Sequence, residues 1–330
     1  MTIILRQLAE QARSASRQLA NLSTERKNEV LLAFARKIRE NTELILSANQ
    51  KDLGSADRLR SQGELSDSSI QRLKLNAVKI EQMAKNFESV AALTDPVGQV
   101  QLATRLDEGL DLHRISCPIG VLLVIFESRP EVVVQISALT LKSGNAVILK
   151  GGKEASESNA CLFGILDQVL REFTDLPDGT VNLLQSREAV SEIVQQNDCL
   201  DLIIPRGSNA LVQHIQQHSR VPVLAHADGI CHVYWDQAAS LSKAMEIVID
   251  AKTEYPAVCN AMETLLIHEQ IPENEIKQLL TNLLEAGVEI RACSAIMKKF
   301  SNKLNGIIHA SEQDWKTEYT DLILSVRLVS

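Results

Sequence analysis

The sequence predicts an α/β protein built around a mainly parallel β-sheet and divided into two domains. The chain has 330 residues, and at about 150 residues per domain it can form two cores. Its composition, 45% hydrophobic and 23% charged, is typical of a soluble globular protein. Between residues 119 and 293, short apolar segments alternate with segments of helical period, which is the pattern of βαβ units.

The first ninety or so residues predict helices. One begins at a capping residue, Ser23 or Thr24, and places Leu31, Phe34 and Ile38 on one face. The polar stretch at residues 49–63 predicts a loop. A second helix ends before Asp95-Pro96, and the residues expected on its apolar face are Leu73, Ala77, Ile80, Ala84 and Phe87.

A β-hairpin is predicted next, at residues 98–118. Apolar and polar residues alternate on both sides of the turn sequence Asp107-Glu108-Gly109. An amphipathic hairpin outside a core often pairs with another subunit, and a plain surface hairpin is an equally good interpretation.

The remaining elements alternate between strand and helix. The predicted strands are Gly120–Phe126, Ala146–Leu149, Val181–Leu184, Leu200–Ile204, Val221–Ala225, Cys231–Trp235, Thr264–His268 and Val288–Cys293. Segments with a helical period between them include Ser156–Phe173, Ser208–His218 and Ser240–Lys252.

Charge and composition exclude several classes of function. A net charge of −8 and an aromatic content of 3% argue against a nucleic-acid partner, which needs a basic face and stacking platforms. The longest apolar stretch, Ile119–Phe126, is too short to cross a bilayer, and the N-terminus has no signal-peptide pattern. We therefore expect no membrane association and a cytoplasmic location. The six scattered cysteines predict free thiols rather than disulfides.

Three predicted strands end in residues suited to an anionic ligand. The strand at 146–149 runs into Lys150-Gly151-Gly152-Lys153, where glycines permit close approach and lysines supply charge. The strand at 200–204 runs into Pro205-Arg206-Gly207-Ser208, and Ser208 can cap the next helix. For each, an ordinary strand–helix junction is the alternative interpretation.

The third strand end is Glu127-Ser128-Arg129-Pro130. Arg129 is a candidate for holding a carboxylate or phosphate. Glu127 and Arg129, two apart in a strand, would point the same way, so the alternative is that they pair with each other.

A metal site has one candidate, His226-x-Asp228-x-x-Cys231-His232. A structural zinc site needs four ligands in two separated pairs, and no second pair is present. We expect no metal, and the better interpretation is an Asp-Gly turn before a strand.

Cys259 is the candidate nucleophile. It follows the Pro256 turn and precedes a predicted strand, so it could sit at the end of an element, where backbone N–H groups stabilise a thiolate and later an oxyanion. An inert, buried thiol is the alternative interpretation.

Four segments together give the chain a specific resemblance. They are Pro118-Ile-Gly-Val-Leu-Leu-Val-Ile-Phe-Glu-Ser-Arg-Pro130, Ser143-Gly-Asn-Ala-Val-Ile-Leu-Lys-Gly-Gly-Lys-Glu-Ala155, Asp201-Leu-Ile-Ile-Pro-Arg-Gly207 and Glu254-Tyr-Pro-Ala-Val-Cys-Asn-Ala-Met-Glu-Thr264. In this order they resemble the γ-glutamyl phosphate reductase (glutamate-5-semialdehyde dehydrogenase) family, a branch of the aldehyde dehydrogenase superfamily. The resemblance runs from the N-terminus to the last residues.

The resemblance implies an activity. NADPH would reduce L-glutamyl 5-phosphate to L-glutamate 5-semialdehyde and release phosphate, the second step of proline biosynthesis, which links the chain functionally to glutamate 5-kinase. Cys259 would attack the acyl phosphate and form a thioester. Its backbone N–H would lie in the oxyanion hole, and the superfamily's usual asparagine donor corresponds to Ser128, so the side-chain donor stays open. The residues that would contact the substrate are Glu127, Ser128, Arg129 and Asn260.

The resemblance also implies a cofactor, NADP(H). Lys150 matches the lysine that holds the adenosine ribose, and Lys153 replaces a glutamate common in NAD-preferring relatives, so it would attract a 2′-phosphate. Glu318 resembles the glutamate that holds the nicotinamide ribose. No base for water activation is expected, because Asp228 and Gly229 stand where many aldehyde dehydrogenases have a glutamate. The other implied cofactor contacts are Gly151, Gly152, Pro205, Arg206, Gly207 and Ser208.

The resemblance implies a domain arrangement as well. Residues 1–97 and 119–230 would form a Rossmann-type NADP-binding domain, 98–118 an oligomerisation hairpin, and 231–330 an α/β catalytic domain. Family members continue past Val329-Ser330, so we expect the catalytic domain to be incomplete at its C-terminus. The full-length form would be a homodimer or larger. Two alternatives remain, namely a different acyl-reducing or aldehyde dehydrogenase, and a non-catalytic cofactor-binding fragment.

Overall fold

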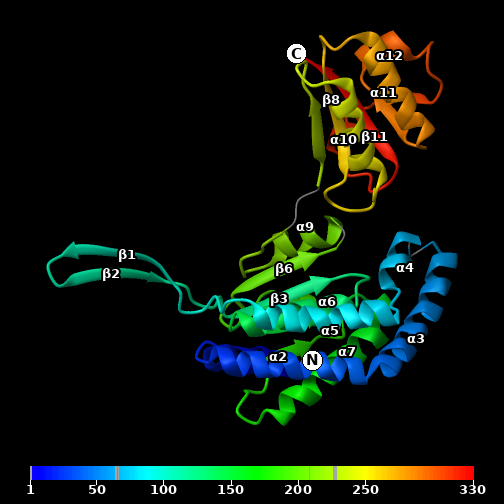
Figure 1. Ribbon diagram of the computed structural model, residues 1–330. Coiled ribbons are helices and arrows are strands. Elements are labelled where there is room, and N and C mark those ends of the chain that lie inside the picture. Colours follow the sequence, from blue (N-terminus) through cyan, green and yellow to red (C-terminus); the bar gives the residue numbers. More distant parts are fainter. Residues whose placement is uncertain (1, 64, 66, 187, 208, 226–228) are drawn as a thin grey trace. The chain divides into compact units, whose positions relative to one another are not determined.

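The computed structural model describes all residues except 1, 64, 66, 187, 208 and 226–228. Residues 1–226 and 227–330 form two compact units, which are described separately. Both contain parallel sheets with helices between the strands (Figure 1), so the α/β prediction is confirmed.

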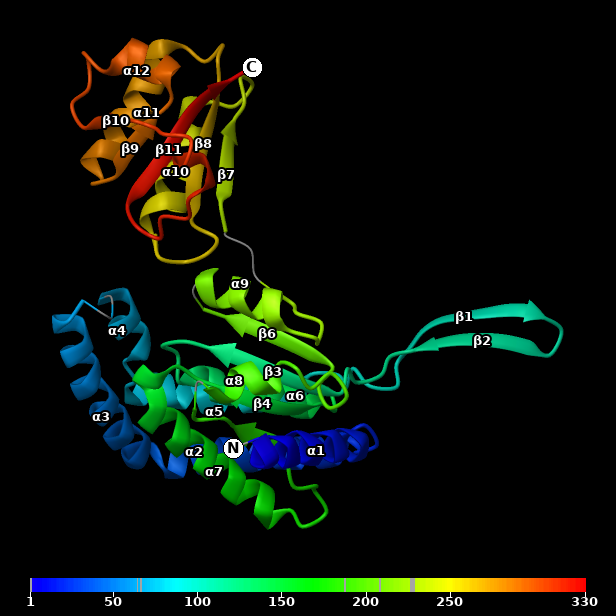
Figure 2. The ribbon, with the colours of Figure 1, turned by 180° about the vertical axis from the view of Figure 1, so that it is seen from behind.

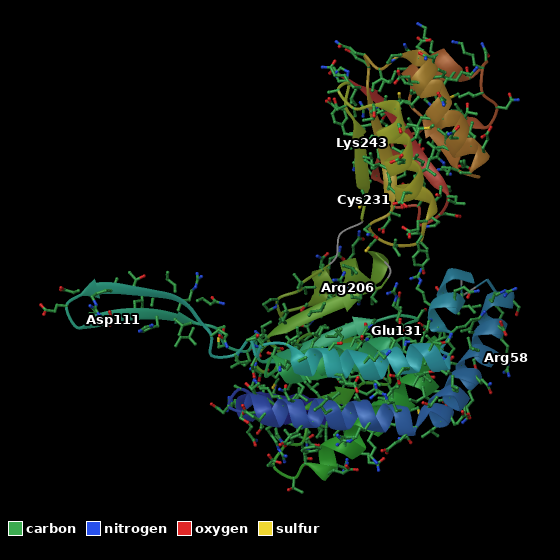
Figure 3. All side chains as sticks on the ribbon, viewed as in Figure 1. Arg58, Asp111, Glu131, Arg206, Cys231 and Lys243 are labelled. Carbon is green, nitrogen blue, oxygen red and sulfur yellow. The ribbon has the colours of Figure 1, made fainter. Side chains whose placement is uncertain are left out.

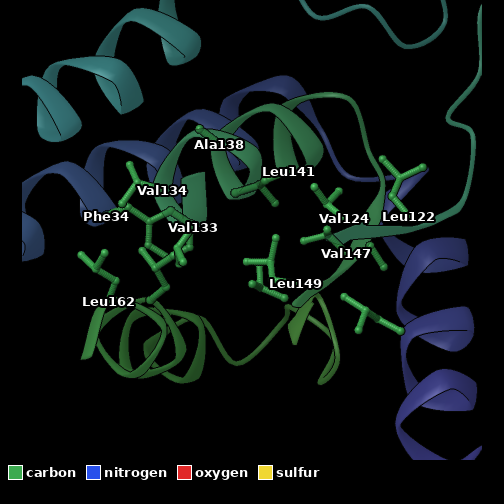
Figure 4. Packing of buried hydrophobic residues seen from close by; sticks show 14 of the residues in the cluster. Phe34, Leu122, Val124, Val133, Val134, Ala138, Leu141, Val147, Leu149 and Leu162 are labelled. Atoms are coloured by element: carbon green, nitrogen blue, oxygen red, sulfur yellow. The ribbon is translucent and has the colours of Figure 1, made fainter. Parts of the chain in front are cut away.

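The sheet of residues 1–226 has the strand order β5-β4-β3-β6 among the described residues, and every neighbouring pair is parallel. Its strands are β3 (Val121–Phe126), β4 (Ala146–Lys150), β5 (Val181–Leu183) and β6 (Leu202–Arg206). All residues of β3 and β4 are buried, because helices cover both faces of a parallel sheet. Figure 4 shows Leu122, Val124, Val147 and Leu149 in this core.

Helices cover the two faces of this sheet. On one face α6 and α7 pack with α2 and α5, whereas α1 and α8 lie on the other (Figures 1 and 2). A short 3₁₀ turn, η1 (Lys153–Ala155), precedes α7. The helix bounds are α1 (Thr2–Leu19), α2 (Thr24–Glu40), α3 (Thr42–Ser61), α4 (Asp67–Leu73), α5 (Ala77–Ala92), α6 (Glu131–Lys142), α7 (Ser156–Glu172), α8 (Glu188–Ile193) and α9 (Asn209–His218).

The predicted loop at residues 49–63 is wrong for residues 49–61, because they belong to the long helix α3, which ends at Ser61. Two of its polar residues, Asn49 and Asp52, are buried and hydrogen-bonded rather than solvated. Asn49 donates to the Leu73 carbonyl and accepts from the Leu75 amide. Asp52 accepts from the amides of Glu157 and Ser158 and so caps the start of α7.

Two other element predictions need correction. Leu73 ends α4 and does not share a helix with Ala77, because Asn76 caps a new helix there and accepts from the Lys79 amide. The segment predicted as a strand at 221–225 makes only an isolated bridge between Ile203 and Val223. The predicted cap at Ser23 is confirmed, since its hydroxyl accepts from the Arg26 amide.

The predicted hairpin is confirmed as β1 (Val100–Asp107) paired antiparallel with β2 (Leu110–Ile115). Gly109 occupies the turn with φ 76°, a conformation that favours glycine. All residues of both strands are exposed.

The sheet of residues 227–330 has the order β10-β9-β11-β8-β7 among the described residues, again all parallel. Helices α10 and α11 pack together beside it (Figure 2). The elements are β7 (Cys231–Trp235), α10 (Leu241–Thr253), β8 (Met262–His268), α11 (Glu273–Glu285), β9 (Glu289–Ala292), α12 (Ser294–Phe300), β10 (Ile307–His309), η2 (Asp314–Lys316) and β11 (Ile323–Val329). Among the described residues, no helix is both long and apolar enough to span a bilayer.

Candidate functional site

Three loops meet at the carboxyl ends of adjacent strands in the first unit. Strand β3 lies between β4 and β6, with Ile125 opposite Lys150 and Phe126 opposite Arg206. The loops that follow these strands therefore start side by side, at the edge where open α/β sheets bind ligands. They carry the predicted substrate residues 127–129 and the predicted cofactor residues 150–153 and 205–207.

A side chain on either of two glycines in these loops would displace a neighbouring polar side chain. A Cβ on Gly151 would lie 2.1 Å from the Asn159 Nδ2 atom, and one on Gly207 would lie 2.7 Å from the Glu127 carboxyl. Asn159 is buried, and its Oδ1 atom has no hydrogen-bond partner within the described part of the chain. A close-fitting backbone cradle with an unused buried acceptor beside it fits a polar ligand such as a dinucleotide.

Positive charge is concentrated at this edge. Lys150 is 8% exposed, and its ammonium donates to the Gly151 carbonyl. Arg129, Lys153 and Arg206 are exposed, and no ion pair or side-chain hydrogen bond engages them among the described residues. Figure 3 shows Arg206 at the end of β6. These cations suit a phosphate-bearing cofactor. They gather at this edge although the chain as a whole has a net charge of −8. Ser208, also predicted to bind cofactor, lies outside the described residues.

The loop after β3 does not continue the strand. Strand β3 ends at Phe126, and Ser128 has φ 50°, which turns the chain into the left-handed region. The idea that Glu127 and Arg129 pair because they are two apart in a strand therefore fails. Ser128 is buried and donates both its amide and its hydroxyl to Glu154, at 2.5 and 2.9 Å.

In the second unit, Cys259 lies in an exposed turn between α10 and β8. The turn is held by two backbone hydrogen bonds, from the Val258 amide to the Tyr255 carbonyl and from the Ala261 amide to the Val258 carbonyl. The Cys259 carbonyl accepts from the Cys231 thiol at 3.5 Å. Asn260 follows in the same turn and is exposed. An exposed thiol on a backbone-fixed turn can reach a substrate, as nucleophilic catalysis requires.

Glu318 and Gly229 lie beside this turn. Gly229 donates its amide to the Glu318 carboxylate at 3.0 Å, and a Cβ on Gly229 would lie 2.3 Å from the Cys259 carbonyl oxygen. Two segments far apart in the sequence thus converge on the cysteine turn. Asp228, noted for the missing water-activating base, lies outside the described residues.

A buried ion pair supports the same region and was not predicted. Lys252 and Glu263, both fully buried, form an ion pair at 2.8 Å. Glu263 also accepts from the amide of Thr320, which has φ 53° and follows Glu318 by two residues. Burial raises the pKa of Glu263 despite Lys252. The sequence contains one indication that Lys252 is buried. Lys252 follows Ala244 and Val248, which are both buried, at helical spacing.

Only part of the candidate metal site at residues 226–232 lies among the described residues. His226 and Asp228 lie outside the described residues, and the His232 ring Nδ1 lies 2.6 Å from the Ile230 carbonyl. In the ranges 2–225 and 229–330, with the gaps given above, no three His, Cys, Asp or Glu side chains are grouped so that they could hold a metal ion.

Comparisons with known proteins now decide the family. The aldehyde dehydrogenase family model matches residues 5–299. The chain belongs to the aldehyde dehydrogenase family. Enzymes of this family are oxidoreductases that use NAD or NADP.

Two similar proteins are gamma-glutamyl phosphate reductases. The chain is 44% identical to the gamma-glutamyl phosphate reductase of Haloquadratum walsbyi over 96% of its own length and 70% of the relative. It is similar to the solved gamma-glutamyl phosphate reductase of Thermotoga maritima, with a TM-score of 0.91 and 36% identity over 98% of this chain and 77% of the other. The predicted resemblance is thereby confirmed.

A more distant solved structure shows the fold alone. The glyceraldehyde-3-phosphate dehydrogenase GapN of Methanocaldococcus jannaschii, complexed with NADP, is 16% identical and has a TM-score of 0.63 over 100% of this chain and 76% of the other.

Proposed function

We propose that this protein reduces L-glutamyl 5-phosphate to L-glutamate 5-semialdehyde with NADPH and releases phosphate, as a reductase of proline biosynthesis. The observation that carries the proposal is the exposed Cys259 turn in a chain 44% identical to a gamma-glutamyl phosphate reductase over 96% of its length. Its substrate, an acyl phosphate, would be supplied by a kinase such as glutamate 5-kinase, and both reactions would take place in the cytoplasm.

The Cys259 thiolate carries the chemistry. It attacks the acyl carbon, a C–S bond forms, the C–O bond to phosphate breaks, and phosphate leaves. When bound, NADPH supplies the hydride that reduces the thioester. The resulting oxyanion collapses, the C–S bond breaks, and the thiolate is regenerated as the aldehyde leaves. The Cys259 backbone N–H stabilises the oxyanion in both steps.

Other residues bind and orient. Arg129 holds a carboxylate or phosphate of the substrate, and Glu127, Ser128 and Asn260 complete that set. Lys150, Lys153 and Arg206 with Gly151, Gly152, Pro205, Gly207 and Ser208 hold the phosphate-bearing part of the cofactor. Glu318 holds the nicotinamide ribose. The exposed hairpin β1–β2 joins copies of the chain in a homodimer or larger assembly.

The reverse reaction tests the function. Glutamate 5-semialdehyde and NADP are supplied with phosphate, coenzyme A or water alone as acceptor, and NADPH is followed by absorbance. We expect turnover that requires phosphate. Turnover with coenzyme A or with water alone would contradict the proposal and favour another dehydrogenase. NADPH binding without turnover would favour a cofactor-binding protein.

A matched pair of cysteine variants tests the nucleophile. Cys259 and Cys117 are both exposed. Cys259→Ala should abolish turnover while leaving NADPH binding intact, and Cys117→Ala should retain turnover. Wild-type activity in Cys259→Ala would refute the assignment.

A further inference from the structure

We propose that Glu154 is a positioning residue that fixes the loop after β3, and with it Arg129, in the conformation that binds the acyl substrate. The inference rests on the proposed function, because Arg129 acts on the substrate only if that function is right. Glu154 belongs to the loop after β4, which is the proposed cofactor loop.

The contact between the two loops is specific. One carboxylate oxygen of Glu154 accepts both the Ser128 amide, at 2.5 Å, and the Ser128 hydroxyl, at 2.9 Å. A carboxylate forms stronger hydrogen bonds than a neutral acceptor does. Ser128 is 5% exposed, so solvent has little access to compete for its donors.

The backbone of Ser128 requires this support. Its φ of 50° lies in a region that residues other than glycine adopt only when the surroundings hold them there. Among the described non-glycine residues, the one other such position is Thr320, whose amide likewise donates to a carboxylate, that of the buried Glu263. Without an acceptor at Glu154, the β3 loop loses both hydrogen bonds that Ser128 donates to it, and Arg129 is the next residue.

Gly152 leaves room for the Glu154 carboxylate. Glu154 lies in η1, directly before α7, and its carboxyl group lies over Gly152, where a Cβ would meet the two carboxylate oxygens at 2.1 and 2.4 Å. The second glycine of the Gly-Gly pair thus makes room for this carboxylate. The first, Gly151, faces Asn159 and Phe126 instead. The two glycines therefore make room for different side chains.

The same contact settles what the Ser128 hydroxyl does in this conformation. A hydroxyl has one proton to donate, and here it goes to Glu154. In this conformation the Ser128 hydroxyl proton is therefore not free to be donated to an oxyanion, whereas the hydroxyl oxygen can still accept a hydrogen bond from the substrate.

Steady-state kinetics of the full chain test the proposal. Glu154→Ala should raise the KM for glutamate 5-semialdehyde by about tenfold or more, the effect of leaving two buried donors of Ser128 without their acceptor. The Kd for NADPH, from its fluorescence, should stay within about twofold, since Glu154 acts on the substrate loop. Glu154→Gln keeps an oxygen acceptor and should recover most of the loss. Glu157→Ala removes an exposed carboxylate three residues on and should behave as wild type.

Three results would overturn the proposal. An unchanged KM in Glu154→Ala would show that the contact does not position the loop. A rise in the NADPH Kd matching the rise in KM would show that Glu154 acts on the cofactor loop instead. A KM in Glu154→Gln as high as in Glu154→Ala would show that the charge of Glu154, and not its hydrogen bonds to Ser128, determines the KM.

Hydrogen exchange separates this inference from the proposed function. The Ser128 amide should exchange faster in Glu154→Ala than in wild type, whatever reaction the protein catalyses. If wild type shows no phosphate-dependent turnover, the proposed function fails, and faster Ser128 exchange would still support the tether. Equal exchange in the two proteins would refute it.

Discussion

Replacing Lys252 with methionine removes one half of the buried ion pair in the second unit. Lys252 and Glu263 are both fully buried, so the variant leaves a carboxylate without its counter-charge in a dry interior. Breaking such a pair costs about 3–5 kcal/mol, because the remaining charge loses its partner and recovers no water. We expect the free energy of unfolding of residues 227–330 to fall by that amount at neutral pH.

Tryptophan fluorescence in urea measures this directly. The two tryptophans of the chain, Trp235 and Trp315, both lie in the second unit, so their emission follows the unfolding of this unit alone. Lys299→Met is the matched control, since Lys299 pairs with Glu273 on the surface of the same unit. An exposed pair contributes about 0.2–1 kcal/mol, so the control should lose far less stability than Lys252→Met.

The pH dependence provides a second test. Burial already raises the pKa of Glu263 above its usual value near 4.5, and loss of Lys252 removes two influences that lower it. A carboxyl group with a raised pKa in the folded state takes up a proton on folding. The deficit of Lys252→Met should therefore be full above the folded-state pKa and shrink as the pH falls toward 4.5.

A double variant tests whether the unpaired Glu263 carboxylate causes the loss of stability. Lys252→Met with Glu263→Gln removes the stranded charge but keeps an acceptor for the Thr320 amide, so it should recover most of the lost stability. A loss under about 1 kcal/mol in Lys252→Met, equal to that of the surface control, would refute the account, as would a deficit that grows at low pH.

Two further substitutions test the ligand loops and the cysteine turn. Lys153→Glu should shift the ratio of kcat/KM values from NADP toward NAD, because a carboxylate repels a 2′-phosphate; an unchanged ratio would show that Lys153 does not select the cofactor. Gly229→Ala would place a Cβ 2.3 Å from the Cys259 carbonyl oxygen, so the turn must move and kcat should fall about a hundredfold while NADPH binding is kept. Wild-type turnover in that variant would mean that the turn tolerates displacement.

Local patterns predicted most strands of the two sheets, but not β10 or β11. Strands β3 and β4 are continuous apolar runs, which is what a strand covered on both faces requires, and β7 was predicted at its observed bounds. Helix α3 was missed because Asn49 and Asp52 look solvated in the sequence, whereas in the structure they cap other segments. A polar residue that is buried in order to bond a distant backbone gives no periodic signal.

For the candidate site, local sequence patterns predicted individual residues but not the contacts between them. Cys259 and the loops at 150–153 and 205–207 could be selected from residue type and from their place after strands. The contacts that hold them could not, because Ser128 meets Glu154 and Gly229 meets Glu318 across 26 and 89 residues. Such pairs exist only once the chain has folded, and no local rule links their members.

A single-turnover experiment without phosphate tests the central claim, that Cys259 forms a thioester. The protein is mixed with glutamate 5-semialdehyde and NADP in phosphate-free buffer, NADPH is followed over time, and the Cys259 peptide is examined by mass spectrometry. We predict a burst of about one NADPH per chain, a glutamyl adduct on Cys259, and steady turnover only after phosphate is added. Steady NADPH formation without phosphate, or a burst that leaves Cys259 unmodified, would contradict the account.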